Sequence, residues 1–332
     1  MNHPVISIII PVYNEELFIE NCLDSVLAQD YPMESLEVIV VNGNSSDKTK
    51  QIIHERYPKV IVLENPDKIV PISMNIGIKQ SKGEYIVRLD AHSLYPNNYL
   101  RKLIEASIIL KADNVGTVCL TDVRNKTLKG LAIKTVLGNR FGVGNSMFRT
   151  GVDRIKEVDT VPFGCFKKDV FQRFGFYNEH LIRNQDIELN KRIKQGGGKI
   201  YLIPDTYCIY FARDNYKSFA RSNYGNGLWN ILTIFYTKNC KALSLRHFIP
   251  LLFVCSLLIP TIIGVFIPSF FYITCFSFLT YLIFITFFSI KEKLDNTTLS
   301  IPHLIWAFTT LHFPYGWGSI IGLFKVLKLK LK

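Results

Sequence analysis

Short β-branched runs alternate with helix-like segments along the first hundred residues. Four runs are apolar enough to form buried strands, namely residues 5–10, 36–41, 60–63 and 86–89. Three segments between them predict helices, at residues 17–27, 49–57 and 72–80. Strands that alternate with helices in this order predict an α/β fold with a mostly parallel sheet and helices on both faces.

The same pattern continues to about residue 200. Residues 97–111 carry apolar side chains at helical spacing and predict a helix that covers the sheet, and residues 115–120 predict a further strand. Residues 185–195 predict a helix that ends at three glycines, 196–198. Residues 138–151 contain few helix formers, so they predict either a surface linker or a mobile loop beside a binding site.

The last third of the chain differs, because its apolar runs are long and nearly free of charge. Residues 249–266 would span roughly 27 Å as a helix, which suffices for a thin bilayer. Residues 268–290 are longer and also uncharged, so the two runs predict a transmembrane hairpin, with a buried helix pair as the alternative. The run 301–324 is interrupted around Pro314, and we expect it to be re-entrant or to lie along the membrane interface.

A basic stretch precedes this membrane region. Arg213, Lys217 and Arg221 come before the aromatic and aliphatic residues 229–236. This arrangement predicts an amphipathic helix at the membrane surface, and packing in an ordinary core is the alternative.

Composition narrows the set of partners. A formal net charge of +12 predicts an anionic partner, either nucleotide phosphates or acidic lipid head groups. We expect no nucleic-acid partner, because the chain has no motif that reads bases. The seven cysteines include no C-x-x-C pair and are expected to be reduced. The apolar run at residues 5–10 is too short for a signal peptide, so the polar part of the chain is expected to stay in the cytoplasm.

The first candidate chemistry follows the run 86–89. Asp90 and His92 are two residues apart, so both would leave the carboxyl end of this strand on the same side. Ligands of open α/β sheets bind at that edge, where a carboxylate and an imidazole can hold a divalent cation against a diphosphate. An isolated D-x-H pair is more simply a turn-capping Asp beside an ordinary His. Likewise, Asp186 in the first turn of helix 185–195 could merely stabilise that turn.

Several motifs follow one another along the chain at characteristic spacing. The first half contains I-I-I-P-V-Y-N-E at 8–15, S-S-D-K-T at 45–49, N-I-G at 75–77, G-E at 83–84 and D-A-H at 90–92. The second half adds D-T-V-P-F-G at 159–164, G-F at 175–176 and R-N-Q-D-I-E-L-N-K-R at 183–192. Over residues 5–230 the chain therefore resembles the family 2 glycosyltransferases, most closely those that build bacterial succinoglycan-type exopolysaccharides.

This resemblance implies a GT-A-like, Rossmann-related domain followed by membrane helices. Residues 1–115 would bind a nucleotide-sugar donor and residues 116–215 the acceptor, followed by an interfacial segment, 216–246, and the membrane region, 247–332. The implied reaction is an inverting, metal-dependent hexosyl transfer from a nucleotide-diphosphate sugar, expected to be UDP-linked, to a hydroxyl of a polyprenyl-linked glycan. Such a reaction belongs to the synthesis of surface or exopolysaccharides.

The resemblance also assigns roles to residues. Asp186 would be the general base that takes the proton of the attacking hydroxyl, while Asp90 and His92 would hold Mn²⁺ or Mg²⁺ at the leaving diphosphate. Glu188 lies about 200° further round the helix and suits the role of base less well. The residues implied to bind the donor are Pro11, Tyr13, Glu15, Asn42, Asp47, Arg88 and Asp90. Those implied to meet the acceptor are Phe163, Gly164 and Gln185.

Three positions depart from the family pattern. Asn42 stands where many relatives have an aspartate that accepts from uracil, and this change weakens any inference about the base. Met74 stands where many have an arginine, a contact that Lys68 or Arg88 would have to replace. His92 replaces a second aspartate, which shifts the expected metal toward Mn²⁺ without excluding Mg²⁺.

Simpler roles remain open for several of these residues. Tyr13 and Glu15 could be a turn residue and a helix-start acid, and Asp47 could cap the helix that follows it. Two other functions also remain open: a polyprenyl-phosphate sugar synthase, which accepts a phosphate, and a non-catalytic membrane scaffold with a decayed site.

The distribution of charge predicts the topology. Nucleotide sugars are cytoplasmic, and the basic residues Lys238 and Arg246 precede the first apolar run. The positive-inside rule then predicts a cell-membrane protein with two spans, whose catalytic domain and C-terminus both face the cytoplasm.

Overall fold

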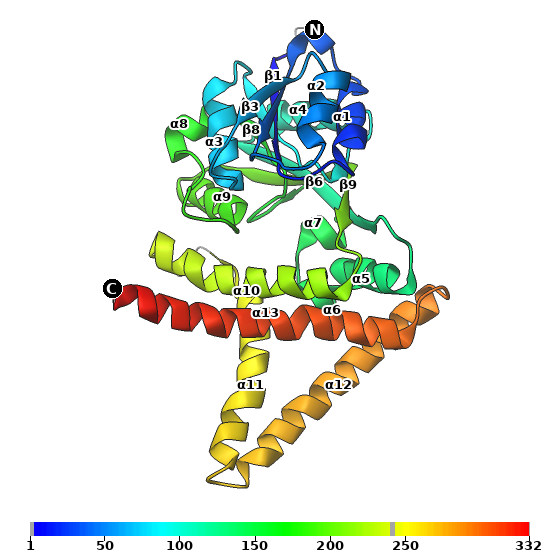
Figure 1. The fold of residues 1–332 in the computed structure, drawn as a ribbon, viewed down its shortest axis with the longest axis vertical. Coiled ribbons are helices and arrows are strands. Elements are labelled where there is room, and N and C mark those ends of the chain that lie inside the picture. The colour runs from blue at the N-terminus through cyan, green and yellow to red at the C-terminus, as the bar shows by residue number, and fades with distance from the viewer. Residues whose placement is uncertain (1–2, 240–242, 332) are drawn as a thin grey trace. The chain divides into compact units, whose positions relative to one another are not determined.

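The computed structural model describes residues 3–239 and 243–331 of the chain (Figure 1). They form two compact units. The first comprises Met1–Leu120 with Met147–Phe211, and the second comprises Thr121–Ser146 with Ala212–Lys332.

The first unit is built on a mixed sheet. Among the described residues its nine strands follow the order β3-β2-β1-β4-β8-β6-β9-β5, with β7 beside β9. The strands are β1 (Ile6–Val12), β2 (Leu36–Asn42), β3 (Ile61–Glu64), β4 (Tyr85–Arg88), β5 (Ser93–Leu94), β6 (Asn114–Val123), β7 (Lys156–Glu157), β8 (Cys165–Lys167) and β9 (Ile200–Ala212). β1 pairs in parallel with β2 and β4, and β2 pairs in parallel with β3. β8 pairs antiparallel with β4 and β6, so the predicted α/β class is confirmed and the antiparallel part lies in the later strands.

Helices cover both faces of this sheet because successive side chains of its central strands alternate between two cores. Ile8 and Ile10 of β1 pack with α1 (Ile19–Leu27) and α4 (Tyr99–Leu110). Ile9 faces the other way. The helices on its side are α3 (Val70–Gln80), α8 (Val170–Phe174) and α9 (Gln185–Gln195). The predicted helices of this unit are thus present, together with α2 (Thr49–Arg56).

The second unit is helical. Its elements are α5 (Leu128–Gly138), α6 (Arg140–Val143), α10 (Tyr216–Thr237), the 3₁₀ turn η3 (Leu245–Phe248), α11 (Ile249–Gly264), α12 (Phe270–Asp295) and α13 (Ile301–Lys330). α10 and α13 lie side by side, and α11 and α12 form a hairpin (Figure 1). Within the described residues, two helical segments are long and apolar enough to cross a membrane, Leu245–Gly264 and Phe270–Asp295.

Two expectations about single segments are wrong. Residues 138–151 are not a loop, since they contain α6 and α7 (Met147–Thr150), and Phe141 stacks on Phe288 with ring centroids 4.8 Å apart. Pro314 does not interrupt the last apolar run, because α13 is one helix of 30 residues. The re-entrant alternative is therefore wrong, and the interfacial alternative stays a prediction.

Packing against α10 explains why α13 continues through Pro314. A proline inside a helix removes one backbone hydrogen bond. Next to Pro314, however, the Tyr315 hydroxyl accepts a hydrogen bond from Asn230 of α10 at 2.8 Å, which holds the helix in place. Ile231 and Leu232 of α10 are also buried. This part of the predicted interfacial segment therefore packs in a core, which is the alternative to lying at the membrane surface.

Candidate functional site

The predicted donor residues gather at the carboxyl edge of the parallel strands. Tyr13 and Glu15 follow β1, Asn42 ends β2, and Asp90 and His92 follow β4. The strand order reverses between β1 and β4. Ligands of open α/β sheets bind at such a reversal, because the connecting loops diverge there and leave a crevice.

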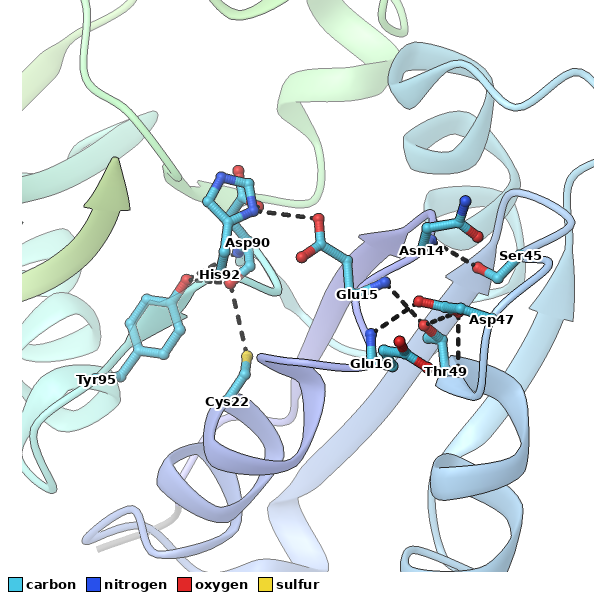
Figure 2. A network of polar contacts seen from close by, with 10 residues as sticks. All are labelled: Asn14, Glu15, Glu16, Cys22, Ser45, Asp47, Thr49, Asp90, His92 and Tyr95. Atoms are coloured by element: carbon cyan, nitrogen blue, oxygen red, sulfur yellow. Dashed lines mark hydrogen bonds and ion pairs between the residues drawn. The ribbon is translucent and has the colours of Figure 1, made fainter. Parts of the chain in front are cut away.

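Backbone and side-chain hydrogen bonds join the loop after β1 to the loop after β2 (Figure 2). The backbone N–H of Glu15 donates to Thr49 Oγ1 at 2.8 Å, and that of Glu16 donates to Asp47 Oδ2 at 3.1 Å. The other oxygen of Asp47 accepts from the backbone and the hydroxyl of Thr49. Although burial raises the pKa of Asp47, these hydrogen bonds outweigh it and lower the pKa overall. Asp47 therefore clamps the two loops together and also accepts from the backbone N–H of the first residue of α2, whose N-cap is Lys48.

The clamped loop brings Glu15 to the residues after β4. His92 Nδ1 lies 3.0 Å from Asp90 Oδ1 and 3.2 Å from Glu15 Oε1 (Figure 2). Burial alone lowers the pKa of His92, but the charge of Asp90 and the hydrogen bond to Glu15 raise it to about 10. The two carboxylates thus favour positive charge at His92, which a proton supplies in the metal-free protein and a bound metal cation supplies when it displaces that proton.

This donor set fits a divalent cation that shares its coordination with a ligand. Among residues 3–239 and 243–331, no three His, Cys, Asp or Glu side chains are arranged to hold a metal ion by themselves. Mg²⁺ and Mn²⁺ with nucleotides commonly take one or two protein ligands and complete their shell with phosphate oxygens and water. Asp90 and His92 supply such a pair.

Asp186 lies in the first turn of α9 and forms an ion pair with Arg88, the last residue of β4. Burial raises the pKa of Asp186, and the guanidinium of Arg88 opposes this rise. Arg88 is buried, and its Nε has no hydrogen-bond partner within the described part of the chain. The structure therefore brings Asp186 to the strand that carries Asp90. It also turns Arg88 toward Asp186.

The other predicted donor residues lie towards β2. Tyr13 is exposed, and Lys68 Nζ lies 5.7 Å from the centroid of its ring. Asn42 is buried, donates to Glu64 Oε2 at 2.8 Å and accepts from the backbone of Ser45. Pro11 lies within β1, one residue before the end of the strand. Of the two cations expected to replace the missing arginine, Lys68 is thus the one beside Tyr13.

Met74 has a structural reason to be apolar. Its side chain is fully buried in the core between α3 and the sheet. An arginine at this position would have to place its charge in that core, so its replacement by Met suits the packing of this chain.

The predicted acceptor residues come from two elements. Phe163 has a positive φ of 50° and is buried, and Gly164 has no room for a side chain because a Cβ would lie 2.1 Å from Asn114 Oδ1. Gln185 begins α9 next to Asp186, and its Oε1 has no partner within the described residues. An amide oxygen that is buried but unpaired is available to a ligand hydroxyl.

Sequence reasoning missed several residues around His92. The ring of Tyr210 in β9 lies 5.0 Å from the ring of His92, and Arg149 lies 5.6 Å from the Tyr210 ring. The Tyr95 hydroxyl bonds to the backbone of Asp90 from both sides, as acceptor at 2.8 Å and as donor at 3.2 Å (Figure 2). No sequence pattern predicts the contact between His92 and Tyr210, because β5 and β9 come together only in the folded sheet.

Comparison with solved structures shows that the fold is the GT-A-like α/β fold. A mannosyltransferase, PcManGT from Pyrobaculum calidifontis, in complex with GDP-Man and Mn²⁺, superposes with a TM-score of 0.58 at 16% identity, over 98% of this chain and 88% of that one. Residues 1–349 of S. aureus TarS, in complex with UDP-GlcNAc, superpose with a TM-score of 0.51 at 17% identity, over 68% of this chain and 66% of that one.

Sequence comparison assigns the family. Residues 7–175 match the family described as glycosyl transferase family 2, and the chain belongs to this family. The succinoglycan biosynthesis protein ExoA of Rhizobium meliloti is 28% identical over 211 residues, which are 62% of this chain and 63% of ExoA. A dolichyl N-acetyl-α-D-glucosaminyl phosphate 3-β-D-2,3-diacetamido-2,3-dideoxy-β-D-glucuronosyltransferase of Methanococcus voltae is 26% identical over 249 residues, 69% of this chain and 77% of that protein. The family resemblance predicted from the motifs is therefore confirmed.

Proposed function

We propose that this chain is a membrane-anchored, inverting glycosyltransferase that moves a hexosyl group from a UDP-linked sugar to a hydroxyl of a polyprenyl-linked glycan. The observation that carries the proposal is the meeting of three groups at one edge of the sheet. Asp90 and His92 follow β4, and Asp186 contacts Arg88 at the end of the same strand. A family 2 transferase requires a base and a site for the leaving diphosphate, and these residues can supply both.

The two ends of the donor would bind at different parts of the carboxyl edge of the sheet. Tyr13 offers an exposed ring for the base, with Lys68 above it to balance phosphate charge. A divalent cation bound by Asp90 and His92 would neutralise the charge that develops on the leaving diphosphate. The clamp between Glu15, Asp47 and Thr49 holds the loop that shapes this end of the site. Mn²⁺ with GDP-Man in PcManGT and UDP-GlcNAc in TarS support a nucleotide-sugar donor of this type.

The acceptor end is assigned to α9. Asp186 takes the proton from the attacking hydroxyl as the new glycosidic bond forms, and Gln185 can accept a hydrogen bond from a neighbouring hydroxyl. Arg88 keeps Asp186 oriented, and its positive charge favours the ionised carboxylate. Glu188 lies about 200° further round α9 and pairs there with Arg192 of the same helix at 2.6 Å, whereas Asp186 meets the end of β4, so the role of base is given to Asp186.

Membrane anchoring is assigned to the hairpin of α11 and α12, which supplies two spans. A relative that acts on a dolichyl-phosphate-linked sugar and another from succinoglycan biosynthesis support a lipid-linked glycan acceptor. Basic residues at the ends of the hairpin favour a cytoplasmic face for the catalytic domain.

The experiment is a donor panel followed by an acceptor comparison. Purified protein with Mn²⁺ is given UDP-, GDP- and dTDP-sugars, and slow hydrolysis without acceptor identifies the donor. Asp186→Asn is then assayed with a polyprenyl-linked glycan and with polyprenyl phosphate. We expect donor binding to persist while transfer to the glycan hydroxyl falls by about 10²- to 10⁴-fold.

The outcomes separate the competing functions. Transfer to polyprenyl phosphate that survives in Asp186→Asn identifies a sugar-phosphate synthase, because an ionised phosphate needs no base. Folded protein that turns over no donor in the panel indicates a scaffold. Glu188→Gln is the matched control, and a loss of transfer there with full activity in Asp186→Asn would exchange the two assignments.

A further inference from the structure

An exposed apolar stripe runs along α13. Trp306, Trp317, Phe324 and Leu331 follow one another at intervals of eleven, seven and seven residues. At 3.6 residues per turn they point within about 40° of one another, over a length of about 38 Å. Their exposed fractions are 57%, 48%, 63% and 89% respectively, and Leu327 between them is exposed to 57%.

The opposite face of α13 is fully packed. Ala307, Leu311, Gly318 and Gly322 are buried there. A Cβ at Gly318 would lie 2.1 Å from the carbonyl oxygen of Tyr224, so the backbones of α10 and α13 are in direct contact. The stripe is therefore the free face of a helix that is held firmly within its unit.

The hairpin of α11 and α12 packs against the same side of α13 that carries the stripe. Phe313 lies four residues before Trp317 and eleven before Phe324, so it shares their direction. Its ring packs 5.1 Å from Phe253 of α11 and 5.8 Å from Tyr281 of α12. A bilayer that receives α11 and α12 would therefore also meet the exposed stripe of α13.

The charge at the end of α13 is all of one sign. Lys325, Lys328 and Lys330 are exposed, and the segment 301–330 contains no Asp or Glu. Lys328, four residues after Phe324, lies in the direction of the stripe near its end, and Lys325 and Lys330 lie on either side of it. Their long side chains let the amino groups reach head groups while the apolar side chains lie deeper. Acidic phospholipids complement this charge.

We propose that α13 lies in the plane of the membrane interface, with its stripe at the boundary between head groups and acyl chains and its terminal lysines on acidic phospholipid head groups. The proposal rests on the membrane anchoring proposed for α11 and α12. It adds a second contact that is selective for acidic lipids, so the lipid composition of the leaflet would affect how tightly α13 binds to the membrane.

Tryptophan depth in nanodiscs tests the geometry. The chain has three tryptophans, so Trp229→Phe combined with either Trp306→Phe or Trp317→Phe leaves one reporter on α13 in the full-length protein. We expect quenching by lipids brominated on their acyl chains, weak quenching by aqueous iodide, and the same depth for both reporters. A spanning helix would separate the two by about 16 Å in depth.

Lipid selectivity tests the charge. Energy transfer from the remaining tryptophan to dansyl-phosphatidylglycerol is compared with transfer to dansyl-phosphatidylcholine in mixed nanodiscs. We expect about a fivefold or greater preference for the acidic lipid that salt abolishes. The triple change of Lys325, Lys328 and Lys330 to Gln should remove it. The same change at Lys59, Lys82 and Lys111, three exposed lysines of the first unit, should not.

Different results would refute the anchoring hairpin, the in-plane helix and the acidic-lipid contact. If carbonate extracts the protein from vesicles, the anchoring hairpin itself is refuted. If the protein stays inserted but the two reporters differ in depth or are open to iodide, the in-plane helix is refuted. Reporters shielded from both iodide and brominated lipid indicate a second copy of the chain on the stripe, which also overturns the proposal. Equal transfer to both dansyl lipids refutes the acidic-lipid contact.

Discussion

The guanidinium of Arg88 at the end of β4 is paired with the carboxylate of Asp186 at the start of α9, although 98 residues separate them in the sequence. The side chain of Arg88 is 8% exposed and that of Asp186 is 26% exposed, so the pair is largely shielded from water. The orientation of the proposed base thus depends on the strand that also leads to the proposed metal ligands.

Arg88→Met should shift the acid limb of the kcat/KM profile to higher pH. The base works as a carboxylate, so activity falls as the pH drops through the pKa of Asp186. Burial raises this pKa and Arg88 opposes the rise, so removing Arg88 raises it further. A profile that keeps its acid limb while kcat falls would show that Arg88 contacts the donor instead.

The same variant should be less stable, by about 3 kcal/mol, because a buried carboxylate loses its partner. Asp186 has a higher pKa in the folded protein than in the unfolded chain. Its ionisation therefore lowers the free energy of unfolding as the pH rises from the unfolded-state pKa to the folded-state pKa, and the stability deficit of the variant should grow over that interval. Arg56→Met is the control, since the side chains of Arg56 and of its partner Glu20 are 56% and 41% exposed. Thermal melting of the detergent-solubilised protein against pH measures both.

Asp90→Ala should lower turnover by about 10³-fold or more, because loss of a ligand removes several kcal/mol of leaving-group stabilisation. His92→Ala should leave the fold intact and raise the Mn²⁺ concentration needed for half-maximal activity. EDTA should abolish wild-type activity, and added Mn²⁺ should restore it. The matched control is Asp153→Ala, whose carboxylate is 84% exposed. Full activity of the wild type in EDTA would refute the metal site.

Asp47→Ala and Thr49→Val should weaken donor binding to the same degree. Thr49 is fully buried, so it can act on the donor only through the clamp that it forms with Asp47 and Glu15. Each change removes hydrogen bonds worth about 1 kcal/mol. We expect donor KM to rise about fivefold with kcat nearly unchanged. A much larger loss in Asp47→Ala alone would mean that Asp47 touches the donor directly.

Cysteine labelling should place both ends of the hairpin in the cytoplasm. A membrane-impermeant maleimide should label Ser269→Cys, between α11 and α12, from outside intact cells. Thr297→Cys, in the exposed turn between α12 and α13, should react only after permeabilisation, because the neighbouring lysines favour the cytoplasmic face. External labelling of Thr297→Cys would contradict the two-span topology.

The sequence by itself determined the parallel part of the sheet in the first unit. β-branched runs such as residues 36–41 have one stable solution as buried strands, and the spacing of the helices between them leads to a parallel sheet. It also determined that Asp90 and His92 leave the same strand end, since side chains two residues apart share a face. The two long apolar helices followed from length and composition, because such runs have few other stable environments.

Only the tertiary structure decided how groups distant in the sequence meet. Nothing in the local pattern around Arg88 indicates that it pairs with Asp186, or that Glu15 reaches His92, because these contacts depend on how strands and helices pack. The same holds for Pro314, whose local signal predicts a break. Contacts of Tyr315 and the neighbouring glycines with α10 and α11 hold α13 unbroken there. Local propensities are worth a few kcal/mol at most, and close packing between helices overrides them.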